Sequence, residues 1–176
     1  MFVESVFLDD IIVMKKEPFI DNRGYFERIF DAEKLEGFGI KFQLVQQNIS
    51  NNVKRGTLRG LHYQTGIYAE DKIIQCIKGR VFDVLVNIDV NSEDYGKWIS
   101  VELSEDNRRM IYVPCKYAHG FQTLEDNTIM MYHMGNYYNA EAADGYNCFS
   151  ETLGIKWPID IGYIISEKDS KLKDFG

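Results

Sequence analysis

The feature of this sequence that most constrains its fold is a succession of short segments that favour β-strands, separated by turn residues. The segments are rich in Ile, Val and aromatic residues, whereas Ala, the best helix former, occurs only six times in 176 residues. Regular helical periods do not separate them, which favours an antiparallel sandwich or barrel over alternating βαβ units. The predicted strands are Ile11–Lys16, Tyr25–Phe30, Lys41–Ser50, Thr57–Gln64, Lys72–Lys78, Arg80–Val90, Lys97–Ser104, Arg109–Val113, His119–Leu124 and Thr128–His133.

Turns and two short helices complete the expected pattern. Polar and glycine residues predict turns at 21–24 and 78–79. One helix is predicted to begin after the N-cap candidate Asp31 and to end at Gly37, and a second lies near Ser166–Leu172. The length suits one domain, and no linker or repeat interrupts it. We therefore expect a single all-β domain over residues 1–176.

Polar and apolar side chains alternate along the predicted strand 80–90. One face carries Val84, Val86, Ile88 and Val90, and the other carries Asp83, Asn87 and Asp89 with Leu85. This alternation predicts a half-buried strand whose second face meets solvent, with a functional face as the alternative.

Charge and cysteine content restrict the partners and the compartment. A net charge of −7 disfavours nucleic acid and anionic membranes, although a small anionic ligand held by a few local Arg and Lys residues is compatible with it. Cys76, Cys115 and Cys148 are scattered without a CxxC spacing, which predicts free thiols in a reducing compartment. Neither a basic leader nor an apolar run of about 20 residues is present, so we expect a cytoplasmic protein without a membrane span.

The segment 55–64 carries the most distinctive chemistry, because Arg59 and His62 lie in an apolar strand that also contains two glycines. His62 is either a core histidine bonded to the backbone or a base that titrates near neutral pH. Strict alternation would place Arg59 and His62 on opposite faces, so contact of both with one ligand requires a bulge or a twist. His119, beside Gly120, has the same two interpretations.

Tyr132 and His133 are adjacent, so only one of them is expected to point inside a barrel. The chain has no HxH or HxxxE pair, and we therefore do not expect a metal site. GxxxxGK and GxSxG motifs are absent as well. The remaining His, Tyr, Lys and Asp side chains suit proton transfer without a cofactor.

A series of motifs from about residue 10 to residue 172 then carries a family resemblance. The motifs include Asp21-x-Arg-Gly-x-Phe26, Gln46-x-Asn48-x-Ser50, Gly56-Thr-Leu-Arg-Gly-Leu-His-Tyr-Gln64, Lys72, Ala118-His-Gly-Phe121, Tyr132 and Ser166-x-Lys-Asp169. In this order they resemble the dTDP-4-dehydrorhamnose 3,5-epimerases, nucleotide-sugar epimerases of the cupin superfamily. The resemblance implies a cupin-type jelly-roll (double-stranded β-helix) barrel, a homodimer and no cofactor.

The resemblance also implies a catalytic set. His62 would be the base that removes the proton next to the keto group, and Asp169 would pair with His62 and orient it. Tyr132 would deliver a proton to the opposite face, and Lys72 would stabilise the enolate oxygen. These roles agree with the chemistry, because inversion needs an acceptor and a donor on opposite faces and the enolate charge needs a cation.

A further set of residues would bind the substrate. Arg59 and His119 would bind the pyrophosphate and sugar region. Arg23 and Phe26 would reach a nucleotide that is bound largely by the neighbouring subunit. The sugar-nucleotide pocket would be lined by Gln46, Gln47 and Asn48, with Tyr138 and Lys168 near it.

Several positions depart from the family pattern. Arg28 stands where the family has a Glu that accepts a hydrogen bond from thymine, and Arg has only donors. This predicts a GDP- or CDP-linked substrate rather than a dTDP-linked one, such as a GDP-linked 4-keto heptose, unless Arg28 points to solvent. Glu70 replaces a Gln, the Lys116-Tyr117 pair replaces Gly-Phe, and Ala143 replaces a substrate-binding Glu.

The function predicted from the sequence is epimerisation of a nucleotide-linked 4-keto sugar at C3, C5 or both, in bacterial surface-polysaccharide sugar biosynthesis. A nucleotide-sugar keto-isomerase would use the same His and Tyr chemistry, and a non-catalytic nucleotide-sugar-binding protein would use only the pocket. A metal-dependent cupin oxygenase is disfavoured by the missing HxH pair.

Overall fold

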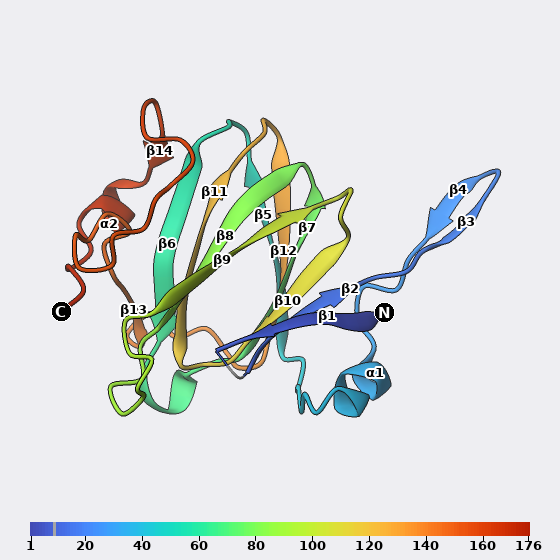
Figure 1. Ribbon diagram of the computed structural model, residues 1–176, viewed down its shortest axis with the longest axis horizontal. Coiled ribbons are helices and arrows are strands. Elements are labelled where there is room, and N and C mark those ends of the chain that lie inside the picture. Colours follow the sequence, from blue (N-terminus) through green and yellow to red (C-terminus); the bar gives the residue numbers. More distant parts are fainter. Residues whose placement is uncertain (9) are drawn as a thin grey trace.

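Two β-sheets packed face to face form the body of the molecule (Figure 1). The computed structural model describes residues 1–8 and 10–176. Within these residues all strand pairs are antiparallel except that between β14 and β6. The first sheet has the order β1 (Phe2–Phe7), β2 (Ile11–Lys15), β10 (Arg109–Val113), β7 (Lys72–Lys78), β12 (Thr128–Met134) and β5 (Gln46–Asn52).

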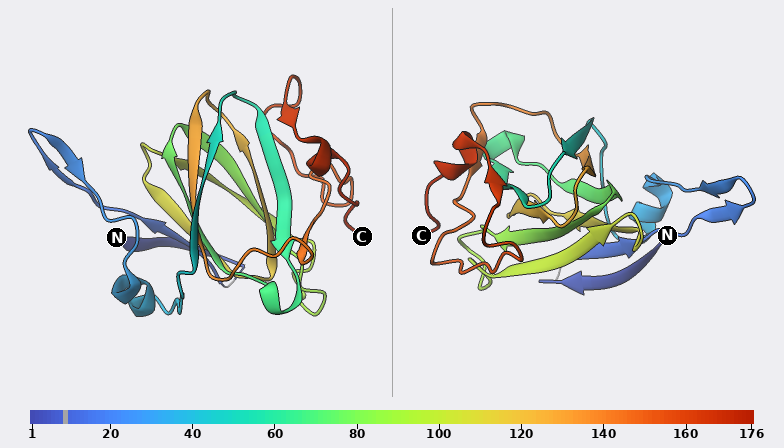
Figure 2. Two further views of the ribbon diagram at one scale, coloured as in Figure 1. Left: turned by 180° about the vertical axis from the view of Figure 1, so that it is seen from behind. Right: turned by 90° about the horizontal axis from the view of Figure 1, so that it is seen from above.

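The second sheet faces the first across the main core. Its order is β13 (Ala143–Gly145), β6 (Thr57–Gln64), β11 (Tyr117–Thr123), β8 (Arg80–Asn87) and β9 (Trp98–Ser104), with β14 (Ile164–Ile165) beside β6. The two layers are seen edge-on in Figure 2. This architecture confirms the all-β, jelly-roll fold class.

Three apolar clusters bury the faces of the two sheets. The cluster between the sheets includes Ile74, Leu85, Leu103 and Phe121, each at most 1% exposed. A second cluster lies on the outer face of the second sheet, where the C-terminal segment contributes Trp157 among others. A third covers the outer face of the first sheet. Both sheets are therefore buried on two faces over much of their area, which explains why many strands are continuously apolar.

The helices occupy the predicted positions. Helix α1 (Ala32–Gly37) begins after Asp31, whose carboxylate accepts a hydrogen bond from the N–H of Lys34 at 3.1 Å. Its buried Leu35 joins the third cluster. Helix α2 (Glu167–Ser170) is capped by Ser166, and a 3₁₀ turn, η1 (Gly66–Tyr68), follows β6.

A projecting hairpin, β3 (Phe19–Asp21) and β4 (Gly24–Phe26), corrects the strand predicted over Tyr25–Phe30. Figure 1 shows the hairpin extending away from the barrel. Glu27, just after β4, is almost buried and pairs with Lys16 at 2.8 Å and with Arg108 at 3.1 Å. These ion pairs draw the chain back to the barrel, so the strand ends at Phe26.

Other boundaries also differ from the sequence expectations. Strand β5 begins at Gln46 rather than Lys41, and β8 ends at Asn87, whose side-chain oxygen accepts the N–H of Asp89 at 2.9 Å and starts a turn. Strands β1, β13 and β14 were not predicted. The two last are only two or three residues long, and β1 is an edge strand with mostly exposed side chains.

The predicted solvent face of β8 is wrong. Asp83 and Asn87 are each 1% exposed, and Leu85 between them is fully buried. This face points into the space between the sheets, so its polar residues are part of the interior rather than of the surface.

Candidate active site

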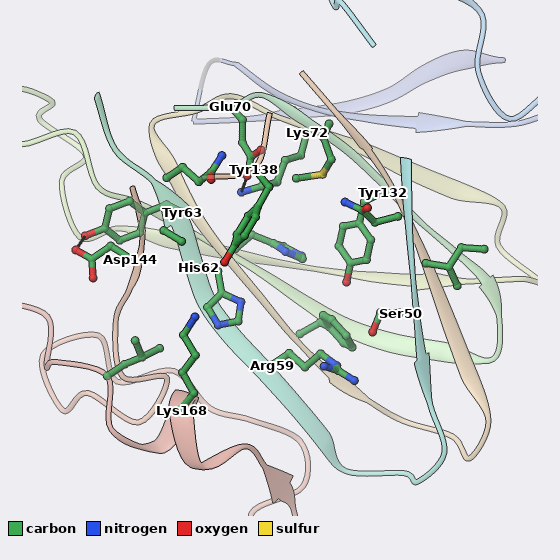
Figure 3. A pocket seen from close by; sticks show the side chains of 18 residues that line it. Ser50, Arg59, His62, Tyr63, Glu70, Lys72, Tyr132, Tyr138, Asp144 and Lys168 are labelled. Carbon is green, nitrogen blue, oxygen red and sulfur yellow. Dashed lines mark hydrogen bonds and ion pairs between the residues drawn. The ribbon is translucent and has the colours of Figure 1, made fainter. Parts of the chain in front are cut away.

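A cavity of about 430 Å³ opens between the two sheets and gathers most of the chemistry-bearing side chains (Figure 3). Strands β5, β7 and β12 of the first sheet form one wall, and β6 and β11 of the second sheet form the other. The residues that line it are Asn48, Ile49, Ser50, Arg59, His62, Tyr63, Gln64, Glu70, Lys72, His119, Phe121, Tyr132, Met134, Tyr138, Ala143, Asp144, Lys168 and Leu172.

His62 projects into this cavity from β6 and is paired with Asp169 of α2. The distance between His62 Nε2 and Asp169 Oδ1 is 2.9 Å, and the imidazole side chain is 47% exposed. Asp169 is buried, and its second oxygen accepts the backbone N–H of Gly60 at 3.1 Å. With a carboxylate on Nε2, the neutral ring carries its proton there and leaves Nδ1 as a free acceptor.

The carboxyl group of Asp169 is held in its ionised form. Burial by itself raises its pKa, but the hydrogen bonds with His62 and with the N–H of Gly60 outweigh burial and lower the pKa below its usual range. Ser166 adds to this lowering, and its Oγ also accepts the N–H of Asp169 at 3.0 Å as the cap of α2. The short C-terminal helix therefore presents an anion to the imidazole.

A bulge in β6 places Arg59 and His62 on the same face, as their contact with one ligand requires. His62 is opposite His119 and Arg59 is opposite Phe121, so three steps along β6 match two along β11. Gly60 sits at the bulge with φ of 111°, and a Cβ there would lie 2.6 Å from the Cα of Gly120. Only glycine fits this close approach.

Tyr132 faces the cavity from the opposite sheet, as Figure 3 shows. His133, the next residue on β12, is fully buried on the other side of the sheet, which confirms that only one of the pair points inside. Burial raises the pKa of Tyr132 well above its usual range, and the nearby carboxylate of Asp83 adds to this. The phenol is therefore protonated throughout the neutral range.

Lys72 and Glu70 lie together on the first-sheet wall. Their charged atoms, Lys72 Nζ and Glu70 Oε1, are 3.5 Å apart, and both side chains are less than 10% exposed. Burial lowers the pKa of Lys72, and the charge of Glu70 opposes this. Burial likewise raises the pKa of Glu70, against the effect of Lys72.

His119 has an acidic partner of its own. Its Nε2 lies 2.7 Å from Oδ2 of Asp83, a carboxyl that is completely buried. Burial raises the pKa of Asp83, against the effect of His119. The other oxygen of Asp83 has no hydrogen-bond partner among the described residues. The cavity thus contains two His–Asp pairs, one half-exposed and one buried.

Most of the predicted site residues meet at this cavity. Those that line it are Asn48, Arg59, His62, Lys72, His119, Tyr132, Tyr138 and Lys168. Asp169 reaches it through His62. Gln46 does not line the cavity itself, but its side-chain oxygen accepts the N–H of Tyr138, which does, at 2.7 Å.

Four predicted residues lie elsewhere in this chain. Gln47 points to the opposite side of β5, where its amide meets Nδ1 of His133 at 2.9 Å, because neighbouring strand residues alternate. Arg23 and Phe26 belong to the projecting hairpin. Arg28 is 67% exposed and pairs with Asp31 at 2.8 Å, so it stabilises the start of α1 and does not line the cavity.

Several residues that line the cavity were not predicted from the sequence as site residues. Ser50 and Tyr63 lay inside quoted motifs. Alternation with Asn48 along β5 was the available signal for Ser50, whereas Tyr63 is adjacent to His62 and alternation gave no signal for it. Asp144 was not recognised because its partners are distant in the sequence: Tyr63 donates to it at 2.9 Å and Lys173 pairs with it at 2.5 Å.

The part of the chain that the structure describes contains no cluster of side chains suited to binding a metal ion. Groups of three or more His, Cys, Asp or Glu side chains suited to a metal ion do not occur among residues 1–8 and 10–176. The described helices are also too short and too polar to cross a membrane.

Comparison with known proteins identifies the family of this chain. The family model described as dTDP-4-dehydrorhamnose 3,5-epimerase matches residues 5–176, nearly the whole chain. The chain belongs to this epimerase family. Its members are isomerases, so the predicted class of enzyme, a nucleotide-sugar epimerase, is confirmed.

Individual members of the dTDP-4-dehydrorhamnose 3,5-epimerase family resemble the chain over most of their length. The Escherichia coli enzyme of that name is 40% identical over 168 residues, covering 94% of this chain and 89% of its own. The Sinorhizobium fredii enzyme is 38% identical over 170 residues, covering 97% and 87%.

Solved structures of the same epimerase family match the fold closely. The Bacillus anthracis epimerase, with TDP and pyrophosphate bound, has a TM-score of 0.95 at 35% identity, covering 98% of both chains. The Legionella pneumophila epimerase, in complex with dTDP-4-keto-L-rhamnose, has a TM-score of 0.93 at 32% identity, covering 98% of this chain and 91% of its own. Both relatives hold thymidine nucleotides.

Proposed function

We propose that this enzyme inverts C3 and C5 of a dTDP-linked 4-keto sugar by removing and returning protons through an enolate. The observation that carries the proposal is the placement of His62 and Tyr132 on opposite walls of one cavity, with the ammonium of Lys72 between the sheets. A flat sugar ring bound between these walls would present one face to the base and the other to the acid.

The proposed reaction balances without a further reactant. Nδ1 of His62 takes the proton from the carbon beside the ketone, and the electrons of the broken C–H bond move to the carbonyl oxygen as the enolate forms. The charge of Lys72 meets that oxygen. The phenol of Tyr132 then gives its proton to the opposite face of the same carbon, and both side chains return to their starting state by exchange with water.

Asp169 would act through His62. Its carboxylate fixes the tautomer that leaves Nδ1 free, and it stabilises the imidazolium after proton transfer. Arg59 and Lys168 line the same cavity and would offer positive charge to a diphosphate.

A thymidine nucleotide is proposed here in place of GDP or CDP. The relatives of known structure hold TDP or a dTDP-sugar. Arg28 was the reason for expecting a nucleobase other than thymine. That reason disappears, because the guanidinium of Arg28 forms an ion pair with Asp31 at the start of α1.

A homodimer is proposed as the working unit. The hairpin projects from the barrel and exposes large apolar side chains at its tip and flanks: Phe19, Ile20, Tyr25 and Phe26 are each more than 60% exposed. A second copy would cover these side chains and would bring Arg23 and Phe26 to its nucleotide site. The three unbridged thiols support the reducing cytoplasm as its compartment.

The experiment that tests this function follows deuterium by NMR with dTDP-, GDP- and CDP-linked 4-keto-6-deoxyglucose in heavy water. We expect deuterium at C3 and C5 of the dTDP sugar. His62→Asn is expected to abolish exchange at both carbons, and Tyr132→Phe to block formation of the epimer, whereas Tyr137→Phe, an exposed tyrosine outside the cavity, should behave as the native enzyme.

Three outcomes would contradict the proposal. Faster exchange with a GDP or CDP sugar would remove the dTDP assignment. A product with its carbonyl moved along the ring would identify a keto-isomerase. Tight binding of dTDP with no exchange in any sugar would identify a binding protein.

A further inference from the structure

Glu70 forms a buried ion pair with Lys72, although the proposed reaction gives Glu70 no role. The charged atoms are 3.5 Å apart, the side chains are 7% and 8% exposed, and both line the cavity. Figure 3 shows them side by side on the same wall, away from His62. Charges this far from solvent interact more strongly than surface pairs do.

Among the described residues, Glu70 is the carboxylate that forms an ion pair with Lys72. Asp71 is the next residue, but its two oxygens accept from the hydroxyl of Tyr112 and from the N–H of Cys115, each at 2.8 Å. Cys115, in the turn before β11, and Asp71 also raise the pKa of Lys72, each less than Glu70 does.

The two strands that pair with β7 at Lys72 supply no charge there, and the histidines of β6 and β11 in the same cavity, His62 and His119, are each paired with an aspartate. The backbone neighbours of Lys72 are Val113 on β10 and Met134 on β12, both apolar. A lysine buried in such surroundings tends to lose its proton, and burial indeed lowers the pKa of Lys72. A neutral amine would stabilise a developing enolate far less than an ammonium does.

We propose that Glu70 is a positioning residue that keeps the side chain of Lys72 charged and holds it at the cavity wall. Glu70 touches neither reacting carbon in this role and acts only through Lys72. This inference rests on the proposed function for its catalytic consequence, but the effect of Glu70 on Lys72 exists without substrate.

The first measurement therefore needs no sugar. Protein labelled with ¹³C at the ε-carbon of lysine is titrated by NMR, and the signal of Lys72 is assigned from its absence in Lys72→Arg. Loss of an opposite charge at this range typically changes a pKa by about one to three pH units. We expect the titration midpoint of Lys72 to fall by about one pH unit or more in Glu70→Gln.

Two further variants make this measurement decisive. Glu70→Asp keeps the carboxylate but withdraws it by one methylene, so a smaller fall in the same direction is expected, and this variant still reports if Glu70→Gln does not fold. Glu141→Gln removes an exposed carboxylate that does not line the cavity and should leave the midpoint unchanged. An unchanged or raised midpoint in both Glu70 variants overturns the proposal.

The second measurement follows the rate. The kcat/KM for deuterium exchange is measured against pH, and its decline at high pH is expected to move to lower pH in the order native, Glu70→Asp, Glu70→Gln. On the declining side Glu70→Gln should be about tenfold slower than the native enzyme for each pH unit by which the decline moves. If the titration midpoint of Lys72 falls but the pH profile of kcat/KM does not move, Glu70 has no effect on catalysis and that part of the proposal is refuted. Absence of exchange in the native enzyme would instead refute the proposed function.

Discussion

The three histidines show how strongly a residue depends on its surroundings. His62 is half-exposed in the cavity beside a carboxylate, and His119 is buried against Asp83. His133 is fully buried on the far side of the first sheet, between the amides of Gln47 and Gln75. The same imidazole is thus a candidate base, a buried partner of an acid and a structural hydrogen-bonding group.

The amide contacts of His133 also favour an uncharged ring. Lys16 donates to the side-chain oxygen of Gln75 at 2.7 Å, which turns the Gln75 amide nitrogen toward Nε2 of His133. The amide nitrogen of Gln47 faces Nδ1 in the same way. Amide nitrogens only donate, so a neutral ring can accept at one of its nitrogens, whereas a charged ring would oppose both amides.

His133 is expected to make the protein less stable in mild acid. Burial lowers its pKa from the usual value near 6.5, so below that value the unfolded chain binds a proton that the folded chain does not. The free energy of unfolding then falls with decreasing pH, by up to about 1.4 kcal/mol per pH unit. In His133→Gln this contribution is absent, so the stability deficit of the variant should shrink between pH 7 and pH 5.

Urea unfolding of both proteins at each pH measures this difference. The remaining titratable groups are the same in the two proteins, so their contributions cancel to a first approximation. A deficit that is constant over this pH range would show that His133 does not resist protonation.

At the scale of elements, β6 shows how one strand can serve two purposes. Its apolar residues Leu58 and Leu61 pack into the outer cluster of the second sheet, while Arg59 and His62 line the cavity. A regular strand cannot do this, because residues three apart point to opposite faces. The bulge at Gly60 resolves the conflict.

Gly60→Ala is therefore expected to destabilise both the fold and the site. The new Cβ would lie 2.6 Å from the Cα of Gly120 and from the carbonyl oxygen of His119, and the backbone conformation disfavours it as well. We expect a loss of about 2–3 kcal/mol in the free energy of unfolding, measured with urea. Gly37→Ala, at the end of α1 with no atom near the added Cβ, is the matched control. Equal unfolding midpoints for the two variants would refute the crowding argument.

At the scale of the whole molecule, the charge distribution differs from the net charge. The chain carries −7 in total, yet the cavity is lined by three cations, Arg59, Lys72 and Lys168, against two carboxylates, Glu70 and Asp144. The overall charge is unfavourable for nucleic acid polymers. Arg59 and Lys168 supply the positive charge that the proposed diphosphate needs.

The projecting hairpin leads to a prediction on assembly. Light scattering after gel filtration is expected to give the native protein a mass near twice 20.5 kDa. The double variant Phe19→Ser/Phe26→Ser removes two exposed aromatic side chains from the proposed interface and should shift the mass toward that of one chain. Ile67→Ser, at a side chain that is 86% exposed but outside the hairpin, should not. A native protein that remains monomeric at high concentration would exclude the dimer.

The sequence by itself determined what depends on neighbouring residues. Strand alternation separated Tyr132 from His133, and the cap Asp31 located the first helix. The need for a bulge between Arg59 and His62 also followed from local geometry alone. These features are set by backbone periodicity and by hydrogen bonds within a few residues, which a sequence displays directly.

Only the tertiary structure decided which distant groups meet. It brings Asp169 to His62, buries Asp83 against His119, and turns Gln47 and Arg28 away from the cavity. Motif resemblance had named the first of these pairs, but the spacing of 107 residues between its members contains no signal for it. The physical reason is that burial and charge pairing arise from sheets and a C-terminal segment packing together, and those contacts join residues whose separation along the chain is unrelated to their distance in space.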